Sequence, residues 1–166
     1  MNRRGSACGK TERTEIMLKD IFMKYYQEQG YNCAETIIRA GNEYYNLGLH
    51  DRDMIMVAGF GGGMQTGNTC GAVLAGISVL SLKYVESRAH ESTDIRPVVC
   101  NLVRRFKVKY NSLLCRDIKA ISFKPDIRCR ETVAAACEIL EETIAEYDLR
   151  LKNEGSAKKL VLRESK

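Results

Sequence analysis

The sequence predicts an all-α protein, a compact bundle of about five helices with a glycine-rich loop before a central buried helix. Three observations support this class. The chain has only two prolines among its 166 residues. Long stretches repeat apolar residues with the period of a helix, and most of these stretches start or stop at typical cap residues. Apolar residues make up 45% and charged residues 28% of the chain, an ordinary composition for one domain with its own core.

Five segments carry the helical periodicity. They span residues 14–30, 32–48, 68–87, 94–115 and 124–149. The third is apolar nearly all round, so we expect it to be the most buried helix. Residues 51–60 fit either a short helix or a strand. Beyond Leu151 the chain turns polar, and NEGSAKK predicts that the last helix ends there.

Polar residues at the starts of these segments are candidate N-caps. They are Asn32, Asp51, Asn68 and Asp94. Glu35, three residues after Asn32, is placed to complete a capping box. If Asn68 caps the third helix, Cys70 falls in its first turn. Unpaired amides and the positive end of the helix dipole stabilise a thiolate there, which predicts a lowered pKa for Cys70.

Charge and hydropathy limit the classes of function. The net charge is +5, and much of it lies near the two ends of the chain. The middle has no basic stripe interleaved with aromatic residues, so no nucleic-acid partner is predicted. No run approaches the roughly 18 apolar residues of a membrane span, and no export signal is evident. We therefore expect a cytoplasmic protein without a membrane span. Its predicted parts are a flexible arm (1–11), one helical domain (12–151) and a loose basic tail (152–166).

Cysteine content is the most unusual feature. The seven cysteines are Cys8, Cys33, Cys70, Cys100, Cys115, Cys129 and Cys137. A permanent disulfide framework is not expected in a reducing compartment, and the chain has no C-x-x-C pair. Any shared site must therefore be assembled from distant segments. Cys100 and Cys137 lie in apolar contexts typical of small core residues, and Cys8 lies in the polar N-terminal arm. We therefore predict that Cys70 alkylates faster than Cys100 or Cys137.

The glycine-rich stretch GFGGGMQTGNTCGAVLAG, residues 59–76, admits three interpretations. It nearly matches a phosphate-binding loop, but Asn68 stands where that loop requires lysine, and the helical surroundings lack a parallel sheet. A second interpretation is a tight turn followed by a close helix crossing. A third is that Gly61, Gly62 and Gly63 let the backbone approach a partner sulfur, metal or cofactor beside Cys70.

Taken with the other cysteines, this stretch resembles the family of redox-active proteins named for the pattern C_GCAxxG_C_C. The resemblance covers residues 31–147. The matching cysteines are Cys33 in YNCAET, Cys70 in TCGAVLAG, Cys115 in LLCRDI and Cys129 in IRCRETV. Cys137 competes with Cys129 for the fourth position. Ala75 stands where the last glycine of the motif belongs, and Gly76 follows it.

The resemblance implies a redox role for these four cysteines and leaves the reaction open. The first hypothesis is thiol-based redox or electron transfer, a possible thiol–disulfide oxidoreductase activity. Since no nicotinamide or flavin motif is evident, its electrons would come from or go to a protein partner. The second is that the same four thiolates bind zinc or an iron–sulfur cluster. The third is a helical interaction module with structural cysteines. Paired tyrosines on short helices also suggest an exposed apolar face and a homodimer.

Overall fold

The computed structural model describes residues 16–92 and 95–164, and within them it contains helices and no β-strands. The α-helices are α1 (Leu18–Met23), α2 (Cys33–Tyr45), α3 (Asp51–Met54), α4 (Gly71–Tyr84), α5 (Ile95–Tyr110), α6 (Cys115–Ser122) and α7 (Arg130–Glu164). The predicted all-α class is therefore confirmed. The expected number of about five helices was too low, because the short helices α3 and α6 carry too few residues for a clear apolar period. No described helix is long and apolar enough to cross a membrane.

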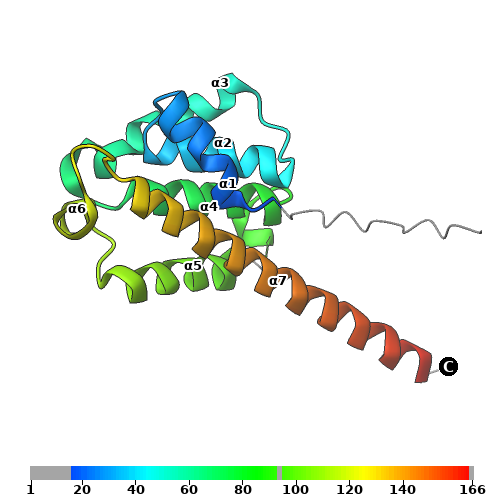
Figure 1. Ribbon diagram of the computed structural model, residues 1–166. Coiled ribbons are helices and arrows are strands. Elements are labelled where there is room, and N and C mark those ends of the chain that lie inside the picture. Colours follow the sequence, from blue (N-terminus) through cyan, green and yellow to red (C-terminus); the bar gives the residue numbers. More distant parts are fainter. Residues whose placement is uncertain (1–15, 93–94, 165–166) are drawn as a thin grey trace, which may run out of the picture.

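Helix α4 forms the centre of the bundle. It packs against α2, α5 and α7, and Figure 1 shows it in green between α2 and α5. Because it has neighbours on several sides, its apolar residues surround the helix instead of forming one stripe. Val79 and Leu80 are fully buried there. The all-round apolar sequence thus predicted the central helix.

Glycine allows α2 and α4 to cross closely. A Cβ atom added at Gly41 of α2 would lie only 2.7 Å from Cγ2 of Val79 on α4. On the next face of α4, a Cβ at Gly76 would lie 3.3 Å from Cδ2 of Leu102 on α5. The close helix crossing that the small residues suggested is therefore present, although Gly41 was not foreseen as part of it.

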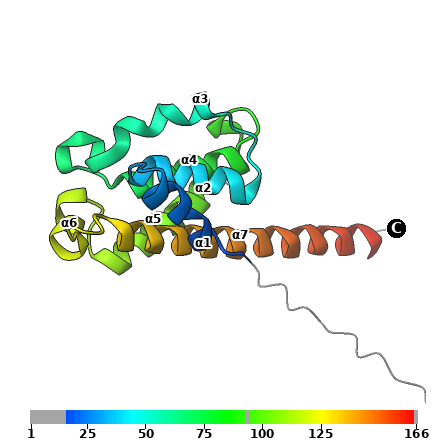
Figure 2. The same cartoon turned by 45° about the horizontal axis from the view of Figure 1, so that its top comes forward.

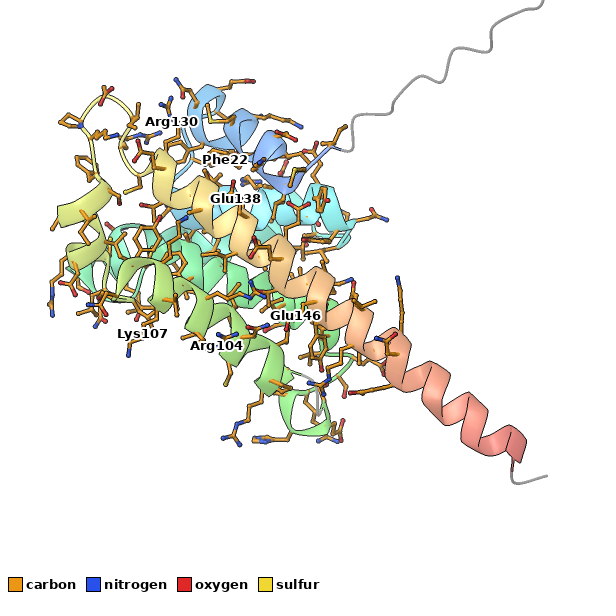
Figure 3. All side chains as sticks on the ribbon, turned by 60° about the horizontal axis from the view of Figure 1, so that its bottom comes forward. Phe22, Arg104, Lys107, Arg130, Glu138 and Glu146 are labelled. Carbon is orange, nitrogen blue, oxygen red and sulfur yellow. The ribbon has the colours of Figure 1, made fainter. Side chains whose placement is uncertain are left out.

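Carboxylates of α7 bind the helices around it. Glu141 accepts hydrogen bonds from the Tyr44 hydroxyl (2.6 Å) and from the backbone N–H of Leu18 (3.2 Å). On the opposite side, Arg105 of α5 pairs with Glu142 and Glu146. Figure 3 shows Glu146 on the side of α7 that faces α5. These bonds fix α7 against α1, α2 and α5.

Two of the candidate N-caps in the first half of the chain are wrong. Residues 51–60 are helical, as α3 and a 3₁₀-helix (Ile55–Phe60), and the N-cap is His50 instead of Asp51. Asp53 accepts a hydrogen bond from the His50 N–H, at 2.9 Å. Helix α4 starts at Gly71 with Cys70 at its N-cap, so Asn68 does not cap it. The Asn68 side chain instead accepts a hydrogen bond from the N–H of Thr69, at 2.9 Å.

Three boundaries differ in the second half. Helix α5 ends at Tyr110 instead of reaching residue 115, because Asn111 adopts a left-handed φ of 53°. Helix α7 starts at Arg130, after a turn in which Arg128 has a φ of 52°. It continues to Glu164, beyond the end predicted near Leu151. A single glycine in a helix costs only about 1 kcal/mol, so Gly155 does not stop it. Asp94 and Cys8 lie outside the described residues.

We expect Gly41→Ala to lower the free energy of unfolding by about 1–2 kcal/mol, because overpacking against stiff Val79 outweighs the gain in helix propensity. Urea denaturation measures the change. Gly59→Ala is the matched control, since a Cβ there meets nothing within 4 Å. A Gly41→Ala protein as stable as the parent would contradict the close crossing.

Candidate functional site

The starts of four helices meet around one cavity of about 140 Å³. Cys33 is the first residue of α2, Cys70 is the N-cap of α4, Cys115 is the first residue of α6, and Cys129 directly precedes α7. All four cysteines line the cavity. The other lining residues are Tyr26, Asn32, Gly62, Ile118, Lys119, Phe123, Arg128 and Thr132. Figure 2 shows α6 beside the start of α7, at the end of the bundle opposite the C-terminus.

Asn32 places Cys33 at the start of α2. The Asn32 Oδ1 atom accepts the backbone N–H groups of Ala34 (2.9 Å) and Glu35 (3.1 Å). In return, Oε2 of Glu35 accepts the N–H of Asn32, at 3.1 Å. The predicted capping box is thus confirmed. The Asn32 amide also donates to the carbonyl of Ala58 (3.0 Å), which joins the start of α2 to the segment before the glycine loop.

An isolated antiparallel bridge pairs Thr69 with Leu114, the residues directly before Cys70 and Cys115. The N–H of Cys70 donates to the carbonyl of Leu113 at 2.8 Å, and the N–H of Cys115 donates to the carbonyl of Asn68 at 2.6 Å. These two bonds form the bridge. They place the starts of α4 and α6 side by side, although the two helices are far apart in the sequence.

The glycine loop leaves room for the cysteines. A Cβ at Gly63 would lie 2.5 Å from Cβ of Cys115 and 2.4 Å from the carbonyl oxygen of Asn68. A Cβ at Gly71 would lie 2.9 Å from Sγ of Cys33. Gly61 packs in the same way against the Asn32 side chain, whereas Gly62 lines the cavity itself. A cofactor-binding role for Gly61, Gly62 and Gly63 stays a prediction.

Cys129 is held in place by Tyr26. The Tyr26 hydroxyl oxygen accepts the backbone N–H of Cys129 at 2.7 Å. The guanidinium of Arg128 donates to the Tyr26 carbonyl at 3.1 Å and lies 4.6 Å from the centre of its ring. Sequence reasoning missed Tyr26, because a tyrosine on an apolar stripe is typical of packing. It also missed Lys119 and Phe123, whose helix α6 was not predicted.

Burial dominates the acidity of the thiols. It raises the pKa of Cys70 to about 12, and hydrogen bonds from the backbone amides of Ala72 and Val73 only partly oppose it. Burial also raises the pKa of Cys33, against hydrogen bonds from the amides of Gly62 and Ala34. The pKa values of Cys115 and Cys129 are raised for the same reason. The expectation of a lowered pKa was therefore wrong: helix starts do surround the thiols, but removal from water has the larger effect.

The thiols interact with one another across the cavity. The negative charge of Cys33 raises the pKa of both Cys70 and Cys129, and that of Cys115 raises the pKa of Cys33. Yet within the described residues no group of three or more Cys, His, Asp or Glu side chains is placed to hold a metal ion. The four thiols suit zinc or iron by their chemistry. They stand around the cavity instead of converging on the point that a single ion would occupy.

The two other described cysteines differ from each other. Cys137 is fully buried on α7, as expected, and burial raises its pKa. It is not among the residues that line the cavity, which Cys129 does line. Cys100 is exposed, so its assignment to the core was wrong. It lies on the outer face of α5, whose buried face is formed by Val98, Leu102 and Phe106.

These observations reverse the predicted order of alkylation. In the reduced protein at neutral pH, iodoacetamide should modify exposed Cys100 well before Cys70, whose side chain is 4% exposed and holds its proton. The rate at Cys70 should continue to rise with pH beyond the ordinary thiol pKa of about 8.5. Timed labelling and peptide mass spectrometry give both rates. Earlier modification of Cys70 than of Cys100 would contradict this assignment.

A pair of glycine variants tests the space around Cys115. Gly62 and Gly63 have φ values of 62° and 65°, so alanine is strained at either position. A Cβ at Gly62 meets only Oε1 of Gln65, at 3.6 Å, whereas one at Gly63 overlaps Cys115. Gly63→Ala should therefore lower the free energy of unfolding by about 2 kcal/mol more than Gly62→Ala. Equal losses in urea denaturation would show that backbone strain, and not this contact, requires glycine.

Comparison with known proteins now identifies the family. No curated protein and no solved structure matches the chain. The model of a family described as "Putative redox-active protein (C_GCAxxG_C_C)" matches residues 31–143. This range covers more than half of the chain and includes all four cysteines that line the cavity. The resemblance seen in the sequence is thereby confirmed, and the chain belongs to the C_GCAxxG_C_C family of redox-active proteins.

Proposed function

We propose that this protein is a thiol-based redox protein whose cavity cysteines cycle between dithiol and disulfide, exchanging electrons with a partner. One observation carries the proposal. Four cysteines from separate helix starts line a single cavity of about 140 Å³. Core cysteines without a role need not share a cavity, and exposed Cys100 and buried Cys137 show that the chain places others elsewhere.

Cys33 is the best candidate for the shared member of the disulfide. The negative charge of its thiolate raises the pKa of Cys70 and of Cys129, and the charge of the Cys115 thiolate raises the pKa of Cys33. Its Sγ atom also lies against Gly71, the residue after Cys70. Oxidation joins Cys33 Sγ to a neighbouring sulfur and releases two protons and two electrons. The electrons pass to an oxidising partner, and reduction reverses each step.

The raised pKa values predict how the potential depends on pH. Because burial keeps the reduced thiols protonated above pH 8.5, each oxidation releases two protons over a wide pH range. The midpoint potential should therefore fall by about 59 mV per pH unit from about pH 6 to beyond pH 8.5. Redox titration with thiol alkylation measures it. A slope that flattens near pH 8.5 would mean that the reacting thiols have ordinary pKa values.

Mass spectrometry of the same titration tests the pairing. Oxidation should remove two cavity thiols and form an internal disulfide that includes Cys33. Cys33→Ser should abolish this disulfide, whereas Cys100→Ser, a change at an exposed cysteine outside the cavity, should leave it unchanged. If the cavity thiols stay unpaired at every potential, the proposal fails.

A second candidate is an iron–sulfur cluster bound by the same thiols. Backbone amides donate hydrogen bonds to Cys33 and Cys70, and four helix starts direct their positive ends to the region. Both features stabilise an anionic centre. A two-iron cluster binds thiolates in pairs, so it needs no single focus. The test is whether protein purified without oxygen contains iron and acid-labile sulfide and absorbs visible light. If it does, and if Cys33→Ser removes all three, the cluster replaces the disulfide as the proposed function.

A further inference from the structure

The exposed rim of the cavity carries two cations and an aromatic ring. Lys119, Phe123 and Arg128 line the cavity and are also exposed to solvent. Phe123 is 42% exposed, unusual for so large an apolar side chain. The Lys119 ammonium lies 5.6 Å from the centre of the Phe123 ring. These three side chains therefore border the cavity on its solvent-exposed side.

The two cations have no carboxylate partner among the described residues. Arg128 binds the carbonyl and the ring of Tyr26, and the Lys119 ammonium lies over the Phe123 ring. The neighbouring acids are engaged elsewhere or lie outside the cavity lining. Asp117 accepts the Ser112 hydroxyl at 2.7 Å, Glu131 pairs with Lys124, and Asp126 does not line the cavity. The rim thus presents uncompensated positive charge.

Cys129 is the thiol next to these cations. It is half-buried, as is Cys33, whereas Cys70 and Cys115 are each 4% exposed. It follows Arg128 directly in the chain, and the positive charges of Lys119 and Arg128 both act to lower its pKa. A reactant bound at the rim would therefore meet Cys129 first.

We propose that the rim formed by Lys119, Arg128 and Phe123 binds the carboxylate of a small anionic disulfide, which reacts at Cys129. This inference rests on the proposed thiol redox function. The Cys129 thiolate attacks one sulfur of the disulfide R–S–S–R, whose S–S bond breaks, and R–S⁻ leaves and takes a proton from water. Cys33 then attacks Sγ of Cys129 and releases the second R–S⁻, which is also protonated. Two thiols of the protein become one disulfide, and one R–S–S–R becomes two R–SH.

Three disulfides of the same aliphatic skeleton test the site: dithiodipropionate, hydroxyethyl disulfide and cystamine, which are anionic, neutral and cationic. The protein carries Cys100→Ser to remove the exposed thiol and Cys33→Ser to trap the first adduct. We expect the mixed disulfide at Cys129, formed fastest with dithiodipropionate and slowest with cystamine. Added salt should reduce this difference, because it screens the rim charges.

Lys119→Gln tests the rim directly. The ratio of the dithiodipropionate rate to the hydroxyethyl disulfide rate should fall by about fivefold. Taking the ratio cancels any effect of Lys119 on the acidity of Cys129. Lys107→Gln is the matched control, since Lys107 is an exposed lysine on α5 outside the cavity lining (Figure 3).

The outcomes separate this inference from the proposed function. Equal rates for the three reagents, an unchanged ratio in Lys119→Gln, or a first adduct at another cavity cysteine would overturn the anionic site. If the anionic site is overturned but an internal disulfide still forms during redox titration, the proposed function stands without the anionic site. A preference for dithiodipropionate that Lys119→Gln removes and Lys107→Gln retains supports the site. Absence of any cavity disulfide in the redox titration of the unmodified protein would overturn both.

Discussion

The close approach of three backbone segments at the glycine loop is the constraint on which the rest of the site depends. Gly63 lies against Cys115 and Asn68, and Gly71 lies against Sγ of Cys33. No residue with a Cβ fits at either position without moving a neighbour. This closeness lets the bridge between Thr69 and Leu114 form, and its two hydrogen bonds join Cys70 to Leu113 and Cys115 to Asn68. The glycines therefore act first on the packing of protein atoms, and through it on the positions of the thiols.

The same packing creates a conflict between burial and helix dipoles. A helix start favours a thiolate, and four of them surround this cavity. Removal from water favours the neutral thiol, and in the reduced protein it has the larger effect on every cysteine that lines the cavity. The helix starts then matter most when a sulfur is anionic, as the attacking thiolate in disulfide formation or as a ligand of a bound cluster. Such a site stores protons with its electrons, which suits a protein that exchanges both with a partner.

Sequence reasoning succeeded where a local pattern has one structural meaning. The all-round apolar segment predicted the central helix α4, and Asn32 with Glu35 predicted the start of α2. It failed where contacts between distant segments determine the burial or the acidity of a residue. Cys100 lies among apolar residues in the sequence but on the exposed face of α5, and the acidity of Cys70 depends on neighbours that its own segment does not contain. Helix α6 was missed because its eight residues are too short for a clear period. Lys119 and Phe123 were missed with it, so the rim of the cavity could not be foreseen.

The central claim is that four separate helix starts hold their cysteines close enough to react with one another. A crystal structure of the reduced protein, grown without oxygen, tests it most directly through the Cα–Cα distances from Cys33 to Cys70, Cys115 and Cys129. The account predicts that at least one of these distances is within about 7 Å, the range that a disulfide requires. If all three are longer and the sulfur atoms point away from a common cavity, the cysteines are separate structural residues and the account is wrong.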